Sequence, residues 1–250
     1  MTSTLPTGAK IINGVKTFIP LENNPTVHAH LSNTFSIQTL TFHDIFTLDP
    51  PPTDLPRPIN ALIFLAAAPI YHRARSALQS TLPNYTTSNE HDPVWIPQTI
   101  GHACGLMAFL HCVLNLDDGT HLVSGSELAK LREELISLAP EDRARVVYES
   151  RFLEEAHMDA ARGGSSGVPG PEEDNGFHFV GFVKAGDGRV WELNGGMPGP
   201  LERGVLGEGE DLISETGLRL TVGDFVEAAR GIEGGGHGAL GVSLVGLAGE

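Results

Sequence analysis

Cys104 is the residue of this 250-residue chain best placed for nucleophilic chemistry. Gly101 and Gly105 mark a turn, and the apolar run LMAFLHCVLNL that follows is typical of a helix buried within a domain. Cys104 is therefore expected in the first helical turn, where unpaired backbone N–H groups and the helix dipole favour an anion. Such a position lowers the pKa of a thiol from about 8.5 toward neutral. The alternative is a small buried hydrophobe, which suits Cys112, two turns inside the helix.

His178 is the strongest candidate for the base among eleven histidines. The segment FHFVGFVKAGDGRVWELNG predicts a β-hairpin with its turn near residue 186, so that paired residue numbers sum to 372. Asn194 then lies opposite His178, with Cβ atoms about 4.5–5.5 Å apart. Its oxygen can accept from His178 Nδ1–H and leave Nε2 for the thiol, as in a catalytic triad. The alternative is that His178 and Asn194 only hydrogen-bond to each other across the strands and have no catalytic role. A register slip of one residue would place the two side chains on opposite faces.

Three further residues compete for roles beside Cys104 and His178. Glu192 lies diagonal to His178 at roughly 7 Å and is a weaker substitute for Asn194. His111 shares a helical face with Cys104, but seven residues place it roughly 10 Å along the axis, so we interpret it as a packing residue. His102 is expected to line the site without acting as the base. No Cys/His spacing resembles a zinc site, so neither a metal nor another cofactor is expected.

Composition bounds the class of protein. The chain is 40% hydrophobic, enough for the core of one domain spanning residues 1–250. A formal charge of −15 argues against nucleic acid and anionic membranes as partners and favours a basic one, although solubility alone also explains it. The start of the sequence has no long apolar run after its basic residue, so we do not expect it to be a secretory signal. The apolar run 61–70 is too short to span a bilayer, and two cysteines give no disulfide framework. A cytoplasmic or nuclear location is expected.

The elements that would position these residues follow no regular βα alternation, so the predicted class is α+β. A helix begins at Pro25 with Asn24 as its N-cap. The other predicted elements are a buried strand over 61–70, helices over 124–139, 140–161 and 221–230 (the last capped by Thr221), and a closing strand over 239–248. Between Cys104 and His178, the segment GGSSGVPGPEEDNG (163–176) is too polar to bury much apolar surface and predicts a flexible loop with a role in function.

Four ordered segments resemble one known family. QTIGHACG is similar to the active-site segment Q-T-I-G-N-x-C-G of the ubiquitin C-terminal hydrolases. The others, between about residue 18 and residue 200, are PLENNPTV, LPRPINALIFL and HFVGFVKAGDGRVWELNGGMPGP. The resemblance implies a papain-like architecture, a central, mostly antiparallel sheet flanked by helices. It also implies thiol-dependent cleavage of amide or ester adducts from the C-terminal glycine of ubiquitin. By the same resemblance, the C-terminal tail of this substrate is basic, which suits an acidic enzyme.

The resemblance also implies a role for each matching residue. Cys104 matches the nucleophile, His178 the base, Asn194 the family's aspartate, and Gln98 the glutamine that helps to form the oxyanion hole. Residues 163–176 match the loop that crosses the site and limits the size of the leaving group. We expect a monomer that binds ubiquitin or a related modifier.

Two departures from the family pattern keep other functions in view. Asn194 replaces an aspartate, and His102 stands where the family usually has asparagine. A ubiquitin-binding module with weak or no turnover is therefore one alternative hypothesis. A general cysteine peptidase, which would cleave short unstructured peptides, is the other.

Overall fold

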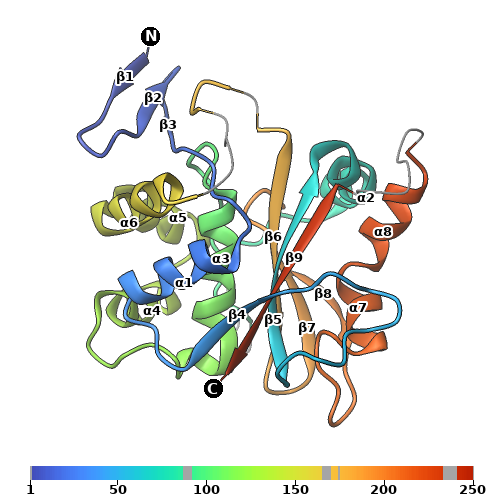
Figure 1. Cartoon of the computed structure of the whole chain (residues 1–250). Coiled ribbons are helices and arrows are strands. Elements are labelled where there is room, and N and C mark those ends of the chain that lie inside the picture. Colours follow the sequence, from blue (N-terminus) through green and yellow to red (C-terminus); the bar gives the residue numbers. More distant parts are fainter. Residues whose placement is uncertain (1, 87–91, 165–169, 174, 233–240, 250) are drawn as a thin grey trace.

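A six-stranded sheet runs through the middle of the molecule, with helices on both of its faces (Figure 1). The computed structural model describes residues 2–86, 92–164, 170–173, 175–232 and 241–249. The strand order is β4-β9-β5-β6-β7-β8, and all five neighbouring pairs are antiparallel. The strands are β4 (Leu40–Asp44), β5 (Ile59–Ala67), β6 (Phe177–Lys184), β7 (Arg189–Leu193), β8 (Leu201–Val205) and β9 (Val242–Gly249). The predicted α+β class with a mostly antiparallel sheet is confirmed.

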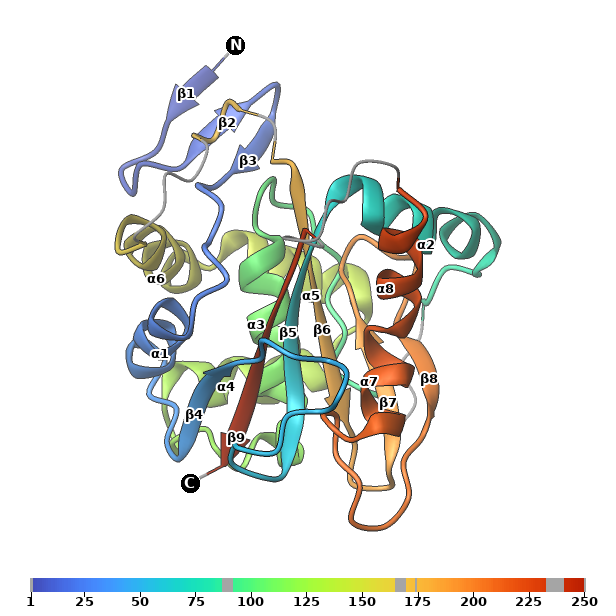
Figure 2. The same cartoon turned by 45° about the vertical axis from the view of Figure 1, so that its right-hand side comes forward.

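The helices form two groups, which Figures 1 and 2 place on opposite sides of the sheet. One group contains α1 (Pro25–Thr34), α3 (Cys104–Asn115), α4 (Glu127–Ile136), α5 (Pro140–Glu149) and α6 (Arg151–Arg162). The other contains α2 (Ala68–Thr81), α7 (Glu215–Thr221) and α8 (Gly223–Arg230). Alternation along β6 serves both groups, because Phe179 joins the core around α3 whereas Val180 joins the core around α8.

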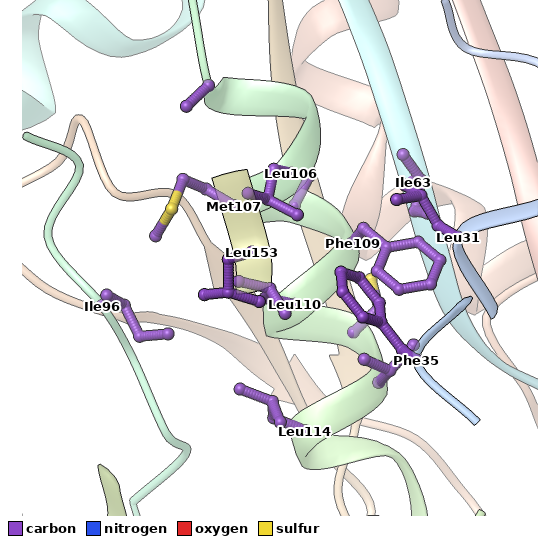
Figure 3. Close-up of a cluster of buried hydrophobic side chains, with 14 of the residues drawn as sticks. Leu31, Phe35, Ile63, Ile96, Leu106, Met107, Phe109, Leu110, Leu114 and Leu153 are labelled. Atoms are coloured by element: carbon purple, nitrogen blue, oxygen red, sulfur yellow. The ribbon is translucent and has the colours of Figure 1, made fainter. Parts of the chain in front are cut away.

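Helix α3 is the centre of the larger core. Every residue from Cys104 to Leu114 is buried, as the apolar run predicted. In Figure 3 the helix passes through a cluster in which Phe109 lies beside Phe35, with ring centroids 5.9 Å apart. Burying each such leucine or phenylalanine side chain stabilises the fold by roughly 1.5–3 kcal/mol. The residue that opens this helix is therefore carried on one of the best-packed elements of the chain.

The strand predicted over 61–70 is only partly correct. Strand β5 ends at Ala67, and the chain turns at once into α2, a helix that the sequence analysis did not predict. Pro69 is the signal that was missed, because proline suits the first turn of a helix and not the interior of a central strand. The error matters because α2 carries Tyr71, a residue of the site.

Two other helix predictions need correction, whereas the cap of α1 is confirmed. Asn24 accepts from Thr26 N–H at 2.8 Å. The predicted helix 140–161 is divided at Ser150, whose extended backbone ends α5 and whose hydroxyl caps α6 by accepting from Leu153 N–H. Thr221 is not an N-cap. It is the last residue of α7, and its buried hydroxyl donates to Gly217 O at 2.8 Å.

A small N-terminal sheet, which the sequence analysis did not predict, lies apart from the central one (Figures 1 and 2). It consists of β1 (Thr2–Thr4), β2 (Lys10–Ile12) and β3 (Val15–Thr17), paired in that order and antiparallel. A 3-10 turn, η1 (Leu116–Gly119), follows α3. Among the described helices, none has the length and apolar composition that crossing a membrane requires.

Three buried histidines make stability depend on pH. Burial lowers the pKa of His28 to about 3 and those of His111 and His157 to about 4. Between about pH 6.5 and pH 4 the unfolded chain binds protons at these rings and the folded chain does not, so stability falls as pH falls. Each ring contributes about 1.4 kcal/mol per pH unit. We expect the free energy of urea unfolding to fall most steeply near the middle of that interval, by up to roughly 4 kcal/mol per pH unit.

The substitution His157→Gln serves as the control for this pH dependence. Its side-chain amide can still donate to Ile19 O, which His157 Nε2 contacts at 2.7 Å, but it does not titrate. The slope should fall by about a third. An unfolding free energy that stays constant from pH 7 to pH 5 would contradict the burial of neutral rings.

Candidate active site

Cys104 is the first residue of α3, as predicted. The preceding Ala103 has no side chain that could cap the helix, so no N-cap side chain accepts from the N–H groups of the first turn. His102 adopts a left-handed φ of 58°, which turns the chain sharply into the helix. Cys104 is buried, with 5% of the residue exposed. Its sulfur lies 4.0 Å from Asn175 Nδ2 and contacts the backbone of Phe179, the residue after His178.

The expected low pKa of the thiol is wrong for the free protein. Burial raises the pKa of Cys104, and the backbone groups of Phe179, Gly105 and Cys104 itself only partly oppose this. Burial likewise lowers the pKa of His178, against which its hydrogen bond with Asn194 acts in the raising direction. Both shifts favour uncharged forms. Burial therefore favours a neutral thiol and a neutral imidazole in the resting pair.

The protonated thiol has a measurable consequence for alkylation. Because the pKa of Cys104 is raised, its thiolate fraction at pH 7 is smaller than that of an ordinary cysteine. We expect iodoacetamide to modify Cys104 slowly at pH 7 and faster with each pH unit up to at least pH 9, by about tenfold per unit. Peptide mass spectrometry of Cys104 measures the rate. A rate that has already reached its plateau at pH 7 would show an ion pair at rest.

His178 and Asn194 lie together, but through the other ring nitrogen. His178 Nε2 is 3.0 Å from Asn194 Oδ1, where the sequence analysis assigned Nδ1 to this contact. Gly196 N–H donates to the same oxygen at 2.9 Å, which fixes Oδ1 as an acceptor. Nε2 must then carry the proton. The lone pair on Nδ1 is left available to accept a proton from a thiol.

The hairpin register explains why the pair forms despite an error in the predicted turn. Observed pairs such as Phe182 with Glu192 sum to 374, two more than predicted, because the turn centres on residue 187. A shift of two keeps every side chain on its predicted face. Asn194 is therefore diagonal to His178 and one residue beyond the end of β7.

Tyr71 and Trp95 hold Asn194 in place, and the sequence analysis missed both. Asn194 Nδ2 donates to the Tyr71 hydroxyl at 2.9 Å, and Trp95 Nε1–H donates to Asn194 O at 3.0 Å. The Tyr71 ring also packs on His178, with centroids 4.2 Å apart. Asn194 is 2% exposed, so each of its polar atoms needs such a partner. No local pattern in the sequence pointed to either aromatic residue.

Gln98 is next to this pair. Its backbone N–H donates to Gly195 O at 3.0 Å, and its side-chain Nε2 donates to Ile100 O at 3.0 Å. A Cβ at Gly195 would lie 2.8 Å from Gln98 N, so only glycine lets the two segments come this close. An amide nitrogen carries two hydrogens, and the contact with Ile100 uses one of them. Gln98 can thus offer one more donor.

The weaker candidates have structural roles. Glu192 accepts two hydrogen bonds of 2.7 Å from Arg75, both side chains being almost completely buried, so it is no substitute for Asn194. His111 Nε2 accepts from Ile96 N–H at 3.0 Å, which confirms it as a packing residue. The buried thiol of Cys112 donates to Leu62 O at 3.4 Å, and burial raises its pKa.

The segment 163–176 is described only in part, because residues 165–169 and 174 lie outside the described residues. Its predicted flexibility therefore stays a prediction. Glu172 pairs with Lys10 of β2 at 3.3 Å, and Asn175 reaches the sulfur of Cys104. The described C-terminal part of the segment therefore contacts the N-terminal sheet through Glu172 and the nucleophile through Asn175.

Other features of the described residues lie away from this site. A cavity of about 560 Å³ is lined by Asp187 and Arg189, at the turn of the β6–β7 hairpin and so at the end remote from His178. Within the described ranges, no three His, Cys, Asp or Glu side chains gather as a metal site would require.

Helix α3 brings the thiol of Cys104 to the backbone of Phe179, the residue after His178 on β6, in keeping with the layout of papain-like cysteine hydrolases. Residues 18–227 match the family described as "Ubiquitin carboxyl-terminal hydrolase, family 1". The chain belongs to this family, which confirms the predicted family and the predicted enzyme class, a cysteine-type ubiquitinyl hydrolase.

Individual relatives agree with the family match. A ubiquitin carboxyl-terminal hydrolase of Aplysia californica is 29% identical over 190 residues, which cover 75% of this chain and 86% of that one. The isozyme L1 of Equus caballus is 32% identical over 137 residues, 55% of this chain and 58% of that one. The catalytic domain of Trichinella spiralis UCH37, solved bound to ubiquitin vinyl methyl ester, has a TM-score of 0.69 at 19% identity and covers 93% of this chain and 95% of that one.

Proposed function

We propose that Cys104, His178, Asn194 and Gln98 form one catalytic site that hydrolyses amide or ester adducts at the C-terminal glycine of ubiquitin. The observation that carries the proposal is the Asn194–His178 hydrogen bond, because it leaves Nδ1 as the basic nitrogen. The contact of the thiol with the backbone of Phe179 supports a short path between sulfur and ring. The charge of −15 suits a basic substrate tail.

The first half of the reaction makes a thioester. Nδ1 of His178 takes the thiol proton as Cys104 Sγ attacks the glycine carbonyl carbon, so the neutral resting pair becomes charged only during attack. The tetrahedral intermediate collapses as the imidazolium gives its proton to the leaving amine or alcohol. In the second half, His178 deprotonates a water that attacks the thioester, and the proton returns to sulfur.

Two groups stabilise charge during these steps. The second hydrogen of Gln98 Nε2 and the backbone N–H of Cys104 serve as oxyanion donors, and each such donor lowers the barrier by about 2.7–4 kcal/mol in acyl transfer. Asn194 orients the imidazolium through its oxygen but adds no negative charge. The imidazolium therefore gains a hydrogen bond to Asn194 but no ion pair, as in papain-like enzymes that use asparagine.

Reaction with ubiquitin vinyl methyl ester tests the proposal. The warhead places an electrophilic carbon where the glycine carbonyl would lie, so a single adduct on Cys104 is expected, located by peptide mass spectrometry. An adduct on Cys112, or none, would refute the assignment. Tight binding without an adduct would instead support the ubiquitin-binding module, and turnover of short peptides in place of a ubiquitin fluorogenic substrate would support the general peptidase.

A further inference from the structure

The N-terminal sheet lies before residue 18, where the family match begins. Its last strand, β3, nevertheless pairs with the segment that precedes the nucleophile in the sequence. Thr17 forms a parallel bridge with Gly101, three residues before Cys104. The sheet is therefore joined directly to the turn that carries the thiol.

Gly101 is held by two backbone hydrogen bonds, one to β3 and one to the residue that follows it. Its N–H donates to Lys16 O at 2.8 Å, and its carbonyl accepts from Phe18 N–H at 3.0 Å. A Cβ at Gly101 would lie 2.8 Å from Thr17 Oγ1, so the close approach needs glycine. Only His102 and Ala103 separate Gly101 from Cys104. The position of the strand therefore bears on the position of the sulfur.

The side chain of Lys16 fixes the strand to α6. Its Nζ lies 2.8 Å from Glu154 Oε2, donates to Tyr148 O at 2.6 Å and sits 4.6 Å from the centre of the Tyr148 ring. The two charged side chains are only 10% and 8% exposed. Thr7, in the turn between β1 and β2, donates to the other oxygen of Glu154. A buried pair with this many partners holds one geometry.

We propose that Lys16 is a positioning residue for the nucleophile. Its ammonium group anchors β3 to α6 through Glu154, and its carbonyl fixes Gly101, so the sulfur of Cys104 is held in register with the imidazole. The role rests on the proposed function of Cys104. It acts on the geometry of attack and leaves the binding of ubiquitin unchanged.

The test compares Lys16→Met with Arg57→Met at a temperature where circular dichroism shows both variants folded. Arg57 is a matched control, because it also pairs with a buried carboxylate, Asp211 at 2.8 Å, and its side-chain hydrogen bonds within the described residues go to Asp211 and not to the nucleophile turn. With a ubiquitin fluorogenic substrate, Lys16→Met should lower kcat about tenfold, or about 1.4 kcal/mol, with KM within about twofold. Arg57→Met should keep the wild-type kcat, and Lys16→Arg should restore most of the loss.

Equal kcat values in the two methionine variants would overturn the positioning role. If Lys16→Met does not fold, Glu154→Gln, which keeps the hydrogen-bond acceptor but not the charge, gives the same comparison. The wild-type chain is the separate check on the function itself. If it does not react with the ubiquitin probe, the proposed function fails, whereas a reactive wild type with unaltered Lys16→Met refutes only the anchor.

Discussion

Replacing Cys104 with alanine is expected to abolish turnover of ubiquitin substrates, with a loss on the order of 10⁶-fold, as found when a nucleophile of a catalytic triad is removed. The thioester cannot form without the sulfur, and alanine keeps the helix because it is a good helix former. Cys112 cannot replace it, since that thiol is fully buried and bonded to Leu62 O. Steady-state hydrolysis and intact mass after incubation with ubiquitin vinyl methyl ester measure the two losses.

Cys112→Ala is the matched control for this variant. It removes the same atom from the same helix, so kcat should stay within about twofold of wild type while stability falls by about 1 kcal/mol. Cys104→Ala should still bind ubiquitin, measured by calorimetry. Residual turnover above about a thousandth of wild type in Cys104→Ala would show that another group performs the attack.

The positions of the site residues could be predicted because they depend on short-range rules. The glycines around Cys104 and the apolar run after it fix a turn entering a buried helix. The parity of a two-stranded ladder places His178 and Asn194 on one face even when the turn is misjudged by a residue. An error of two in the pairing sum therefore left the pair intact.

The supports of the site could not be predicted, because they come from distant segments. Tyr71 lies on a helix that begins within a run interpreted as a strand, and Trp95 reaches Asn194 over 99 positions of sequence. Nor does the sequence show that Lys16 and Glu154 meet, since 138 positions separate them. Each contact depends on packing that only the complete sheet creates.

The direction of the pKa shift of the Cys104 thiol also could not be predicted from local sequence. The helix dipole is a local cause and predicted a lowered pKa for Cys104. Burial by Leu21 and Phe179, which pack on the first turn at Gly105, is a tertiary cause with the opposite sign. The second effect is larger in the free protein. The residues packed around the first turn of α3 therefore affect the pKa of Cys104 at least as strongly as the helix dipole does.

Replacing His178 with alanine is expected to lower kcat/KM by about 10³-fold, within the 10²–10⁴ that general acid–base catalysis contributes. The loss is smaller than for removal of Cys104, because the Cys104 thiol can still lose its proton to water and attack as a thiolate. The residual rate should therefore rise with pH toward the raised pKa of Cys104. The wild-type rate should already be near its plateau at pH 7, since burial keeps the pKa of His178 below its ordinary value. Single-turnover rates from pH 5 to pH 9 distinguish the two profiles.

His72→Ala is the control that separates the base from its neighbour. His72 is exposed on α2 beside Tyr71, and its charge lowers the pKa of His178. Its removal should keep kcat/KM within about threefold and move the acid limb of the profile to slightly higher pH. If His178→Ala kept the wild-type acid limb while His72→Ala lost it, the titrating base would be His72. A neutral imidazole with its lone pair on Nδ1 predicts the reverse, because only that ring has its proton fixed on Nε2 by Asn194.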